Sequence, residues 1–323
     1  MPDSQRHDET DVILAATGGM PALDTEMDVD AETEIEMAAT KKLGIMGWLA
    51  IGWLALILVM AIIPGIFPFG ELGERDIEAL RNDEGVSIAH PFGFDSRGSD
   101  LATRVIYGCR ASVIVSVGSI LFGLVIGGIL GLMSGYFRGR LDSVIVNVFN
   151  VMLAIPALVL ALTLATVFAS GDNVSYTRRL VVVTLAIGIV SVPILGRITR
   201  ASTLTWSERE FVIAAKAMGA RSHRIIIREV LPNVLPAMFS ITLLGMAIAI
   251  ITEGGLAVIG VGIPAELNTP SWGNLIATGR SQMLLGAPNQ IVGPALFIFF
   301  TVLSLNYLGD VVRARFDVRE SVL

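Results

Sequence analysis

Long apolar stretches separated by polar segments follow one another from residue 43 to near the end of the chain. A helix needs about 20 apolar residues to cross a bilayer core that is about 30 Å thick. The stretches close to that length are residues 43–67, 111–137, 143–170, 180–196, about 235–263 and about 291–309. The pattern therefore predicts an all-α polytopic membrane protein with six transmembrane helices and both termini on the same side.

Composition agrees with this pattern, because 53% of the 323 residues are hydrophobic and only 16% are charged. Soluble domains are about 25% charged. Eleven of the 29 acidic residues lie within residues 1–40, so residues 1–42 are expected to form an acidic, disordered cytoplasmic tail. Residues 43–110 would hold the first transmembrane helix and an extracytoplasmic segment, and residues 111–323 a core domain with five helices.

The distribution of Lys and Arg predicts the orientation. With a cytoplasmic N-terminus, the inside segments carry fourteen basic residues and the outside loops eight, apart from Arg6 in the tail. Cytoplasmic loops are enriched in Lys and Arg, so this count favours an N-in, C-in topology. Seven of the fourteen lie within residues 197–228, which places that polar loop in the cytoplasm.

The polar loop at about residues 197–232 is longer than a simple connection requires. Residues 210–218 predict a helix, and Gly219 is the residue type that ends a helix with a positive φ. Four residues share one narrow face of that helix: Phe211, Ala214, Ala215 and Met218. Ser222 is the candidate N-cap of a second helix, which we expect to stop at Pro232. Such a loop is either a knob that docks into a partner or a hairpin that covers its own bundle.

Small residues and prolines within the predicted spans indicate close packing and kinks. Four glycines repeat every fourth residue on one face of the second span: Gly123, Gly127, Gly131 and Gly135. This spacing predicts a helix that another helix approaches closely. Pro156 and Pro193 each remove a helix hydrogen bond and permit a kink, which is either a tolerated irregularity or part of a transport pathway.

Glu253 is the ionisable residue that interrupts the fifth span. A charged group there is costly, so it should face protein or water. A structural partner near the outer interface and a substrate contact both remain open. In the outer segment, residues 101, 105 and 109 recur every four positions, which predicts a short amphipathic helix at the interface or a surface that receives a delivered molecule.

Enzyme motifs are absent from the sequence. It contains no G-x-x-x-x-G-K-S/T phosphate loop, no G-x-S-x-G nucleophile elbow and no H-E-x-x-H zinc motif. Cys109 is the single cysteine, and the three histidines lie far apart. We therefore expect a non-catalytic chain with no catalytic residue, metal site or bound cofactor of its own.

The polar loop resembles the EAA loop of ATP-binding cassette (ABC) importer permeases, whose pattern is E-A-A-x3-G-x9-I-x-L-P. The matching residues are Ala214, Ala215, Gly219, Leu231 and Pro232. Ile213 and Glu229 stand where the pattern has Glu and Ile. The segments HPFGFDSRGSDLATRVIYGCRASV, GYFRGRLD, ITEGGLAVIGVGIP, PSWGNLI and NYLGD are also similar to the dipeptide/oligopeptide/nickel importer family. The resemblance covers about residues 43–318 and is strongest to the C-type second permease.

This resemblance implies a type I ABC importer fold in a bacterial cell membrane. It implies a second homologous permease, two cytoplasmic ATPases that bind ATP and Mg, an extracytoplasmic binding protein, a peptide substrate and surrounding lipid, but no nucleic acid. The helix ending at Gly219 would be the coupling helix. The implied ATPase-coupling residues are Glu210, Ala214, Ala215, Lys216, Met218, Gly219, Ala220, Arg221, Arg224 and Pro232. The alternatives are a nickel-chelate or glutathione importer subunit, or an ATP-independent secondary transporter.

Overall fold

The computed structural model describes residues 44–67, 70–78, 86–169, 175–263, 269–283 and 289–321. Its contacts group residues 43–316 into one unit and the two ends of the chain into another, and only the first is treated below. Within the described ranges the backbone is almost entirely helical, with a single β-bridge between Phe94 and Asp100. The predicted acidic tail lies outside the described residues.

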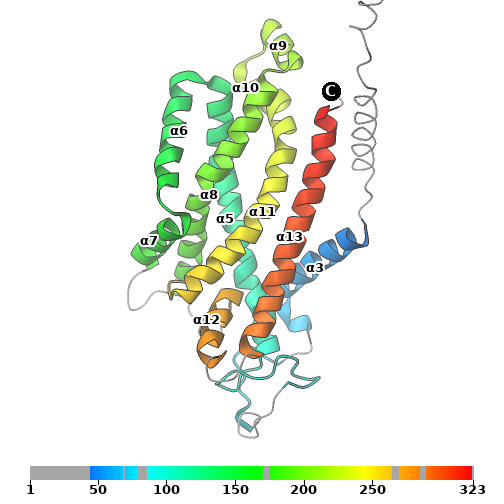
Figure 1. Cartoon of the computed structure of the whole chain (residues 1–323), viewed down its shortest axis with the longest axis vertical. Coiled ribbons are helices and arrows are strands. Elements are labelled where there is room, and N and C mark those ends of the chain that lie inside the picture. Colours follow the sequence, from blue (N-terminus) through cyan, green and yellow to red (C-terminus); the bar gives the residue numbers. More distant parts are fainter. Residues whose placement is uncertain are drawn as a thin grey trace, which may run out of the picture. The chain divides into compact units, whose positions relative to one another are not determined.

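The described helices follow one another along a bundle (Figure 1). In chain order they are α3 (Ile45–Ile62), η1 (Pro64–Ile66), α5 (Leu101–Phe137), α6 (Gly139–Ala154), α7 (Ala157–Ala169), α8 (Tyr176–Ser207), α9 (Glu210–Ala217), α10 (Ser222–Ile225), the π-helical turn η2 (Ile226–Val230), α11 (Leu231–Val258), α12 (Trp272–Met283) and α13 (Asn289–Ser321). Five stretches are long and apolar enough to span a membrane, and α6 with α7 makes a sixth if the bent pair is one span. The predicted all-α, multi-span fold class is confirmed.

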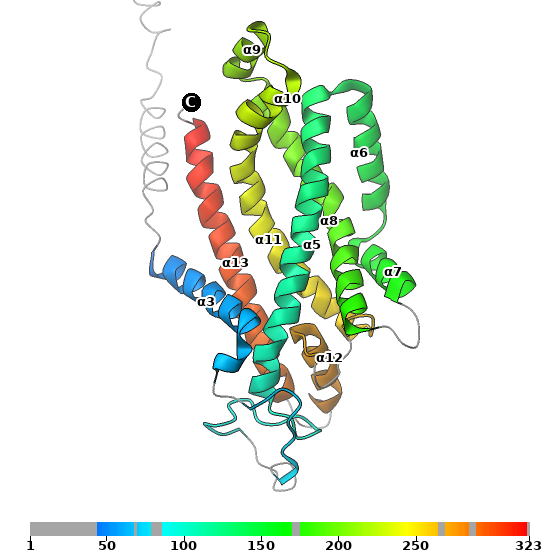
Figure 2. The same cartoon turned by 180° about the vertical axis from the view of Figure 1, so that it is seen from behind.

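Helix α5 is the central helix of the unit and contacts α3, α6, α8, α11 and α12. Figure 2 shows it running along the bundle beside α8 and α11. Its N-terminus is capped by Asp100, whose carboxylate accepts a hydrogen bond of 2.8 Å from the Thr103 amide. The predicted helix over residues 101–109 is present, but it forms the first turns of α5 and is not a short helix of its own, and its Val105 and Cys109 are completely buried.

The four glycines of α5 lie against α8. A Cβ on Gly123 would stand 2.7 Å from the Cβ of Ser191, and one on Gly135 would stand 2.7 Å from the Cβ of Thr203. Between them, Gly131 would meet the Cβ of Thr199 at 2.8 Å. The two backbones can approach this closely only because the facing residues of α5 have no side chain.

Pro156 breaks the predicted span of residues 143–170. Helix α6 ends at Ala154, and α7 continues at an angle of 85° to it. Ile155, directly before the proline, has φ −88° and ψ 128°, the extended conformation that a following proline ring enforces. Pro193, by contrast, lies buried within α8, and the helix runs through it without a break.

Pro232 does not end a helix, so that prediction is wrong. Residues 222–258 form one continuous helical stretch in which the π turn η2 directly precedes Pro232. A proline ring clashes with the carbonyl four residues earlier in a regular α-helix, and that residue, Arg228, lies in the wider π turn. Ser222 is the first residue of α10 and not its N-cap, which is Arg221.

Candidate functional site

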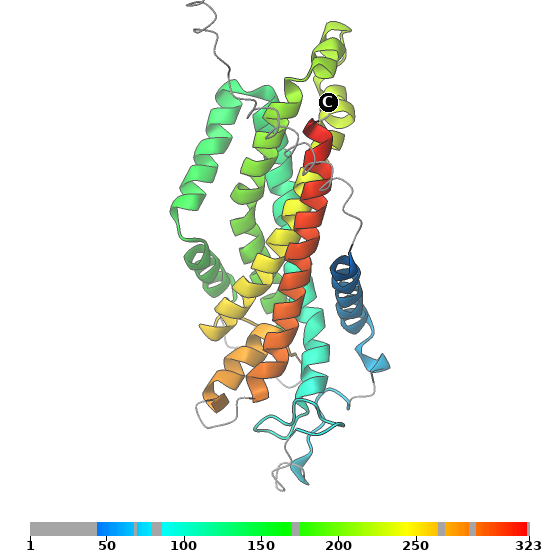
Figure 3. The same cartoon turned by 45° about the vertical axis from the view of Figure 1, so that its right-hand side comes forward.

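The loop formed by α9 and its flanking turns lies beyond the ends of α5 and α8 (Figures 1 and 3). Helix α9 ends in a turn at Gly219, whose φ is +78°. The Gly219 amide donates to the Lys216 carbonyl at 3.0 Å, and the Ala220 amide donates to the Ala215 carbonyl at 3.1 Å. These two bonds define a Schellman motif, the helix ending that favours glycine in the left-handed position.

One face of α9 packs on the protein's own bundle. Val212 and Ala215 are buried in an apolar cluster with Trp206, Ile225 and Val234. Ala215 is 8% exposed, so this predicted coupling residue is turned away from any partner. The predicted single face of Phe211, Ala214, Ala215 and Met218 is therefore divided between the bundle and the surface.

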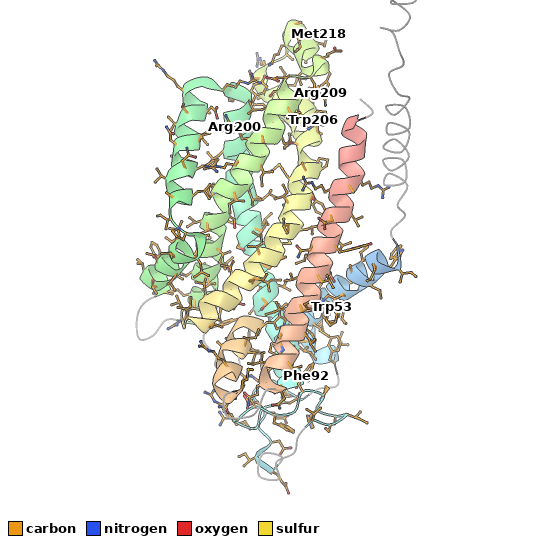
Figure 4. The ribbon with its side chains drawn as sticks, viewed as in Figure 1. Trp53, Phe92, Arg200, Trp206, Arg209 and Met218 are labelled. Carbon is orange, nitrogen blue, oxygen red and sulfur yellow. The ribbon has the colours of Figure 1, made fainter. Side chains whose placement is uncertain are left out.

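The opposite face of α9 is exposed and rich in apolar side chains. Met218, labelled at the tip of the loop in Figure 4, is 82% exposed, and Ile213 is 56% exposed. Phe211 is also exposed. The other predicted coupling residues that are exposed are Glu210, Ala214, Lys216, Gly219, Arg221, Arg224 and Pro232, while Ala220 is half-buried. Phe211 and Ile213 were not among the predicted coupling residues. Val212 and Ala215, spaced by three residues, pack on the bundle, and the apolar residues that do not fit this spacing are the ones left exposed.

At the opposite end of the bundle, the loop before α5 is held by two aspartates (Figure 1). Asp95 forms a buried ion pair with Arg104 and accepts the Arg97 and Ser99 amides at 2.8 Å and 2.9 Å. Asp100 caps α5 and contacts the His90 ring at 3.2 Å. The polar residues of this segment therefore fold the loop onto α5.

Glu253 is completely buried in α11 and contacts the start of α12. Its Oε1 accepts a hydrogen bond of 2.7 Å from the Ser271 hydroxyl. Trp272, the next residue, donates from Nε1 to the Val105 carbonyl of α5 at 3.0 Å. Of the two hypotheses for Glu253, these contacts support the structural one: the carboxylate joins α11 to α12, a short helix that hydropathy did not predict.

Gly273 lies against the carboxylate of Glu253, so replacing Gly273 tests the contact between α11 and α12. A Cβ at Gly273 would lie 2.6 Å from Oε2 of Glu253. We expect Gly273→Ala to lower the melting temperature by roughly 5 °C or more, since overpacking costs about 1–3 kcal/mol. The reaction of a thiol-specific dye with buried Cys109, the single cysteine, reports unfolding. Gly254→Ala is the matched control, because the nearest atom to its Cβ would be 4.0 Å away. Equal melting temperatures would contradict the contact.

A resident metal is not indicated by this geometry. Among the residues that the structure describes, no group of three or more His, Cys, Asp or Glu side chains could hold a metal ion. The features that remain are a bundle of membrane-spanning helices and a structured loop with an exposed apolar tip. They are those of a membrane-embedded helical protein with a structured loop outside the bundle.

This architecture is that of a type I ABC importer permease. It matches a chain in an inward-facing structure of the MetNI methionine ABC transporter with a TM-score of 0.51 and 18% sequence identity. The match covers 66% of this chain and 96% of that chain. At this identity the likeness establishes the fold.

Residues 127–322 match the family described as binding-protein-dependent transport system inner membrane component. The glutathione transport system permease protein GsiD of Pectobacterium atrosepticum is 34% identical over 73% of this chain and 75% of its own length. The dipeptide transport system permease protein DppC of Alkalihalophilus pseudofirmus is 33% identical over 85% of this chain and 86% of its own length. The chain belongs to this family of multi-pass bacterial membrane proteins, whose members are non-catalytic permease subunits.

Proposed function

We propose that this chain is one permease subunit of an ATP-driven ABC importer for dipeptides and oligopeptides. It forms half of the translocation pathway, and a second homologous permease forms the other half. Two cytoplasmic ATPases bind ATP and Mg and supply the energy, and an extracytoplasmic binding protein delivers the peptide. The observation that carries this proposal is the α9 loop, a folded knob that exposes apolar side chains at one end of the bundle.

The surface of the loop suits a protein partner. Ile213 and Met218 would be unfavourable in water, and exposed apolar groups bordered by polar residues mark interaction sites. Glu210, Arg221 and Arg224, close to Ile213 and Met218 in the chain, are polar residues of the same loop and are also exposed. Binding of α9 in a groove of an ATPase would cover the apolar tip and let closure of the ATPase pair move the permease between outward-facing and inward-facing states.

Small peptides are the substrate class that the relatives support. The relatives include dipeptide and glutathione permeases, and glutathione is itself a tripeptide. A glutathione importer is therefore the second candidate. A nickel-chelate importer receives less support, since no histidine lies in any predicted span and metal selection would fall to the binding protein.

Reconstitution tests this function. The chain, the proposed partner permease and the two proposed ATPases would be purified as a complex and placed in liposomes with the binding protein. The binding protein would first be screened by thermal shift against dipeptides, longer peptides, glutathione and nickel complexes. We expect stabilisation by peptides and uptake that requires ATP. Uptake that continues without the ATPases would contradict the proposal and support a secondary transporter.

The N-in topology gives a separate prediction. Ile88 and Met218 are both strongly exposed, with relative exposures of 103% and 82%. Ile88 belongs to the segment before α5, at the opposite end of the bundle from the α9 loop, where Met218 is labelled in Figure 4. A membrane-impermeant maleimide should label Ile88→Cys in intact cells, but Met218→Cys only after permeabilisation. Buried Cys109 serves as the unlabelled background. Labelling of Met218→Cys from outside, or external protease cleavage within residues 1–42, would reverse the orientation.

A further inference from the structure

The end of α5 and the turn that follows it each contact the α9 loop. The Nζ of Lys216 lies 5.2 Å from the centre of the Tyr136 ring, a cation–π geometry that joins α9 to the end of α5. Arg138 forms an ion pair of 2.7 Å with Glu208, which lies between α8 and α9. The two contacts thus hold both ends of α9, one before its first residue and one in its last turn.

Asp142 connects the same turn to α8. Its two carboxylate oxygens accept hydrogen bonds from Nε and Nη2 of Arg200 at 2.6 Å and 2.7 Å. The hydroxyl of Ser134, at the end of α5, donates to the same carboxylate. A bidentate pair between a carboxylate and a guanidinium fixes orientation as well as distance. The ends of α5, α6 and α8 are therefore joined at one carboxylate.

Packing beneath α9 completes the connection. Tyr136 and Leu132 of α5 pack on the apolar cluster that contains Val212 of α9. Gly131, directly before Leu132, brings the backbone of α5 against Thr199 of α8. Close-packed helices with interlocked surfaces do not slide independently. Helix α9 and the ends of α5 and α8 consequently form one body.

We propose that residues 134–142 receive the movement of the coupling loop, with Tyr136, Arg138 and Asp142 as positioning residues. Displacement of α9 by an ATPase then moves the α5–α8 pair directly through side-chain contacts. The competing route runs only along the chain, from α9 into its covalent neighbours α8 and α10. This inference rests on the proposed function, since it names the element through which the same coupling acts.

Tyr136 and Asp142 suit an experiment because neither lies on α9. Replacing them leaves the amino-acid sequence of α9, the helix offered to the ATPase, unchanged. Tyr136→Leu removes the ring that faces Lys216 and keeps an apolar side chain. Tyr136→Phe is the matched control, because the phenyl ring retains the cation–π contact. Asp142→Asn keeps the shape of the side chain and removes the charge that pairs with Arg200.

The assay uses the complete reconstituted transporter and measures three quantities for each variant. These are ATPase co-purification, the rate of ATP hydrolysis, and the number of substrate molecules imported per ATP. We expect Tyr136→Leu and Asp142→Asn to retain the ATPases and hydrolysis but to import at least about threefold less substrate per ATP. Tyr136→Phe should import within about twofold of the unmodified chain.

Two results would overturn the inference. The first is unchanged import per ATP in Tyr136→Leu and Asp142→Asn. This result would show that movement passes from α9 to the bundle through its covalent neighbours α8 and α10 alone. Alternatively, co-purification, hydrolysis and import could fall together with the melting temperature reported by Cys109, which would assign these residues to folding alone. If instead the unmodified complex does not retain ATPases or hydrolyse ATP, the proposed function itself fails, and that outcome is seen before any variant is compared.

Discussion

Replacing Gly219 with glutamate is expected to abolish ATP-dependent transport, although the chain still inserts into the membrane. Gly219 has φ +78°, and no atom lies within 4 Å of the position of a Cβ. The backbone strain of a non-glycine residue there is about 1–2 kcal/mol, which a multi-span bundle can tolerate. The added side chain projects from the loop tip beside Met218, where it would block the proposed ATPase groove with an unpaired charge.

Gly260→Glu is the matched control for this experiment. Gly260 has φ +91° and equally open surroundings, but it follows α11 at the other end of the bundle. Both variants carry the same added charge and a similar backbone strain. Membrane fractionation would measure insertion, and co-purification would measure ATPase binding. Loss of transport only in Gly219→Glu supports the coupling role, whereas equal uptake in both variants would refute it.

Replacing Gly131 with leucine is expected to separate α5 from α8 and destabilise the whole bundle. The first added carbon would lie 2.8 Å from the Cβ of Thr199 and 3.0 Å from the amide nitrogen of Arg200. Backbone atoms cannot move aside as a flexible side chain can, so the cost should reach or exceed the usual overpacking range of about 1–3 kcal/mol. The melting temperature should fall by at least about 5 °C, or the protein should fail to accumulate.

Gly52→Leu provides the comparison for that substitution. Gly52 lies in the membrane helix α3, and no atom stands within 4 Å of its Cβ position. The same dye reaction at Cys109 can follow both proteins in detergent. Unchanged stability of Gly52→Leu beside a loss in Gly131→Leu would locate the effect in the α5–α8 contact. A stable Gly131→Leu protein would show that the two helices tolerate separation.

The local sequence shows that Pro156 and Pro193 can each break a helix, but it does not show whether either one does. Both lie in apolar stretches, and both remove one helix hydrogen bond. At Pro156 the chain turns by 85° between α6 and α7. Pro193 is buried, and α8 around it is packed along α5, where Gly127 closely approaches Gly196. Packing over the length of a helix can hold it continuous, and this packing is set by a distant segment.

The loop shows a similar division between local and distant causes. Helix formers followed by Gly219 were enough to predict a helix that ends in a left-handed turn, since both depend on neighbouring residues. Which face points outward depends on the cluster around Val212, whose other members come from α5, α8, α10 and α11. The local pattern therefore predicts that Ala215 lies on the partner surface, whereas in the structure Ala215 packs on the bundle.

Hydropathy, residue spacing and short motifs are local properties, and they were enough to predict the all-helical membrane fold, the approximate positions of most apolar spans, the glycine face of α5 and the family. The tertiary structure was needed to show that the glycines meet α8, that Glu253 contacts Ser271 directly before α12, and that Tyr136 and Asp142 connect the loop to the bundle. These contacts join residues separated by 18 to 80 positions in the chain. Their partners depend on how the helices pack against one another, which no local pattern specifies.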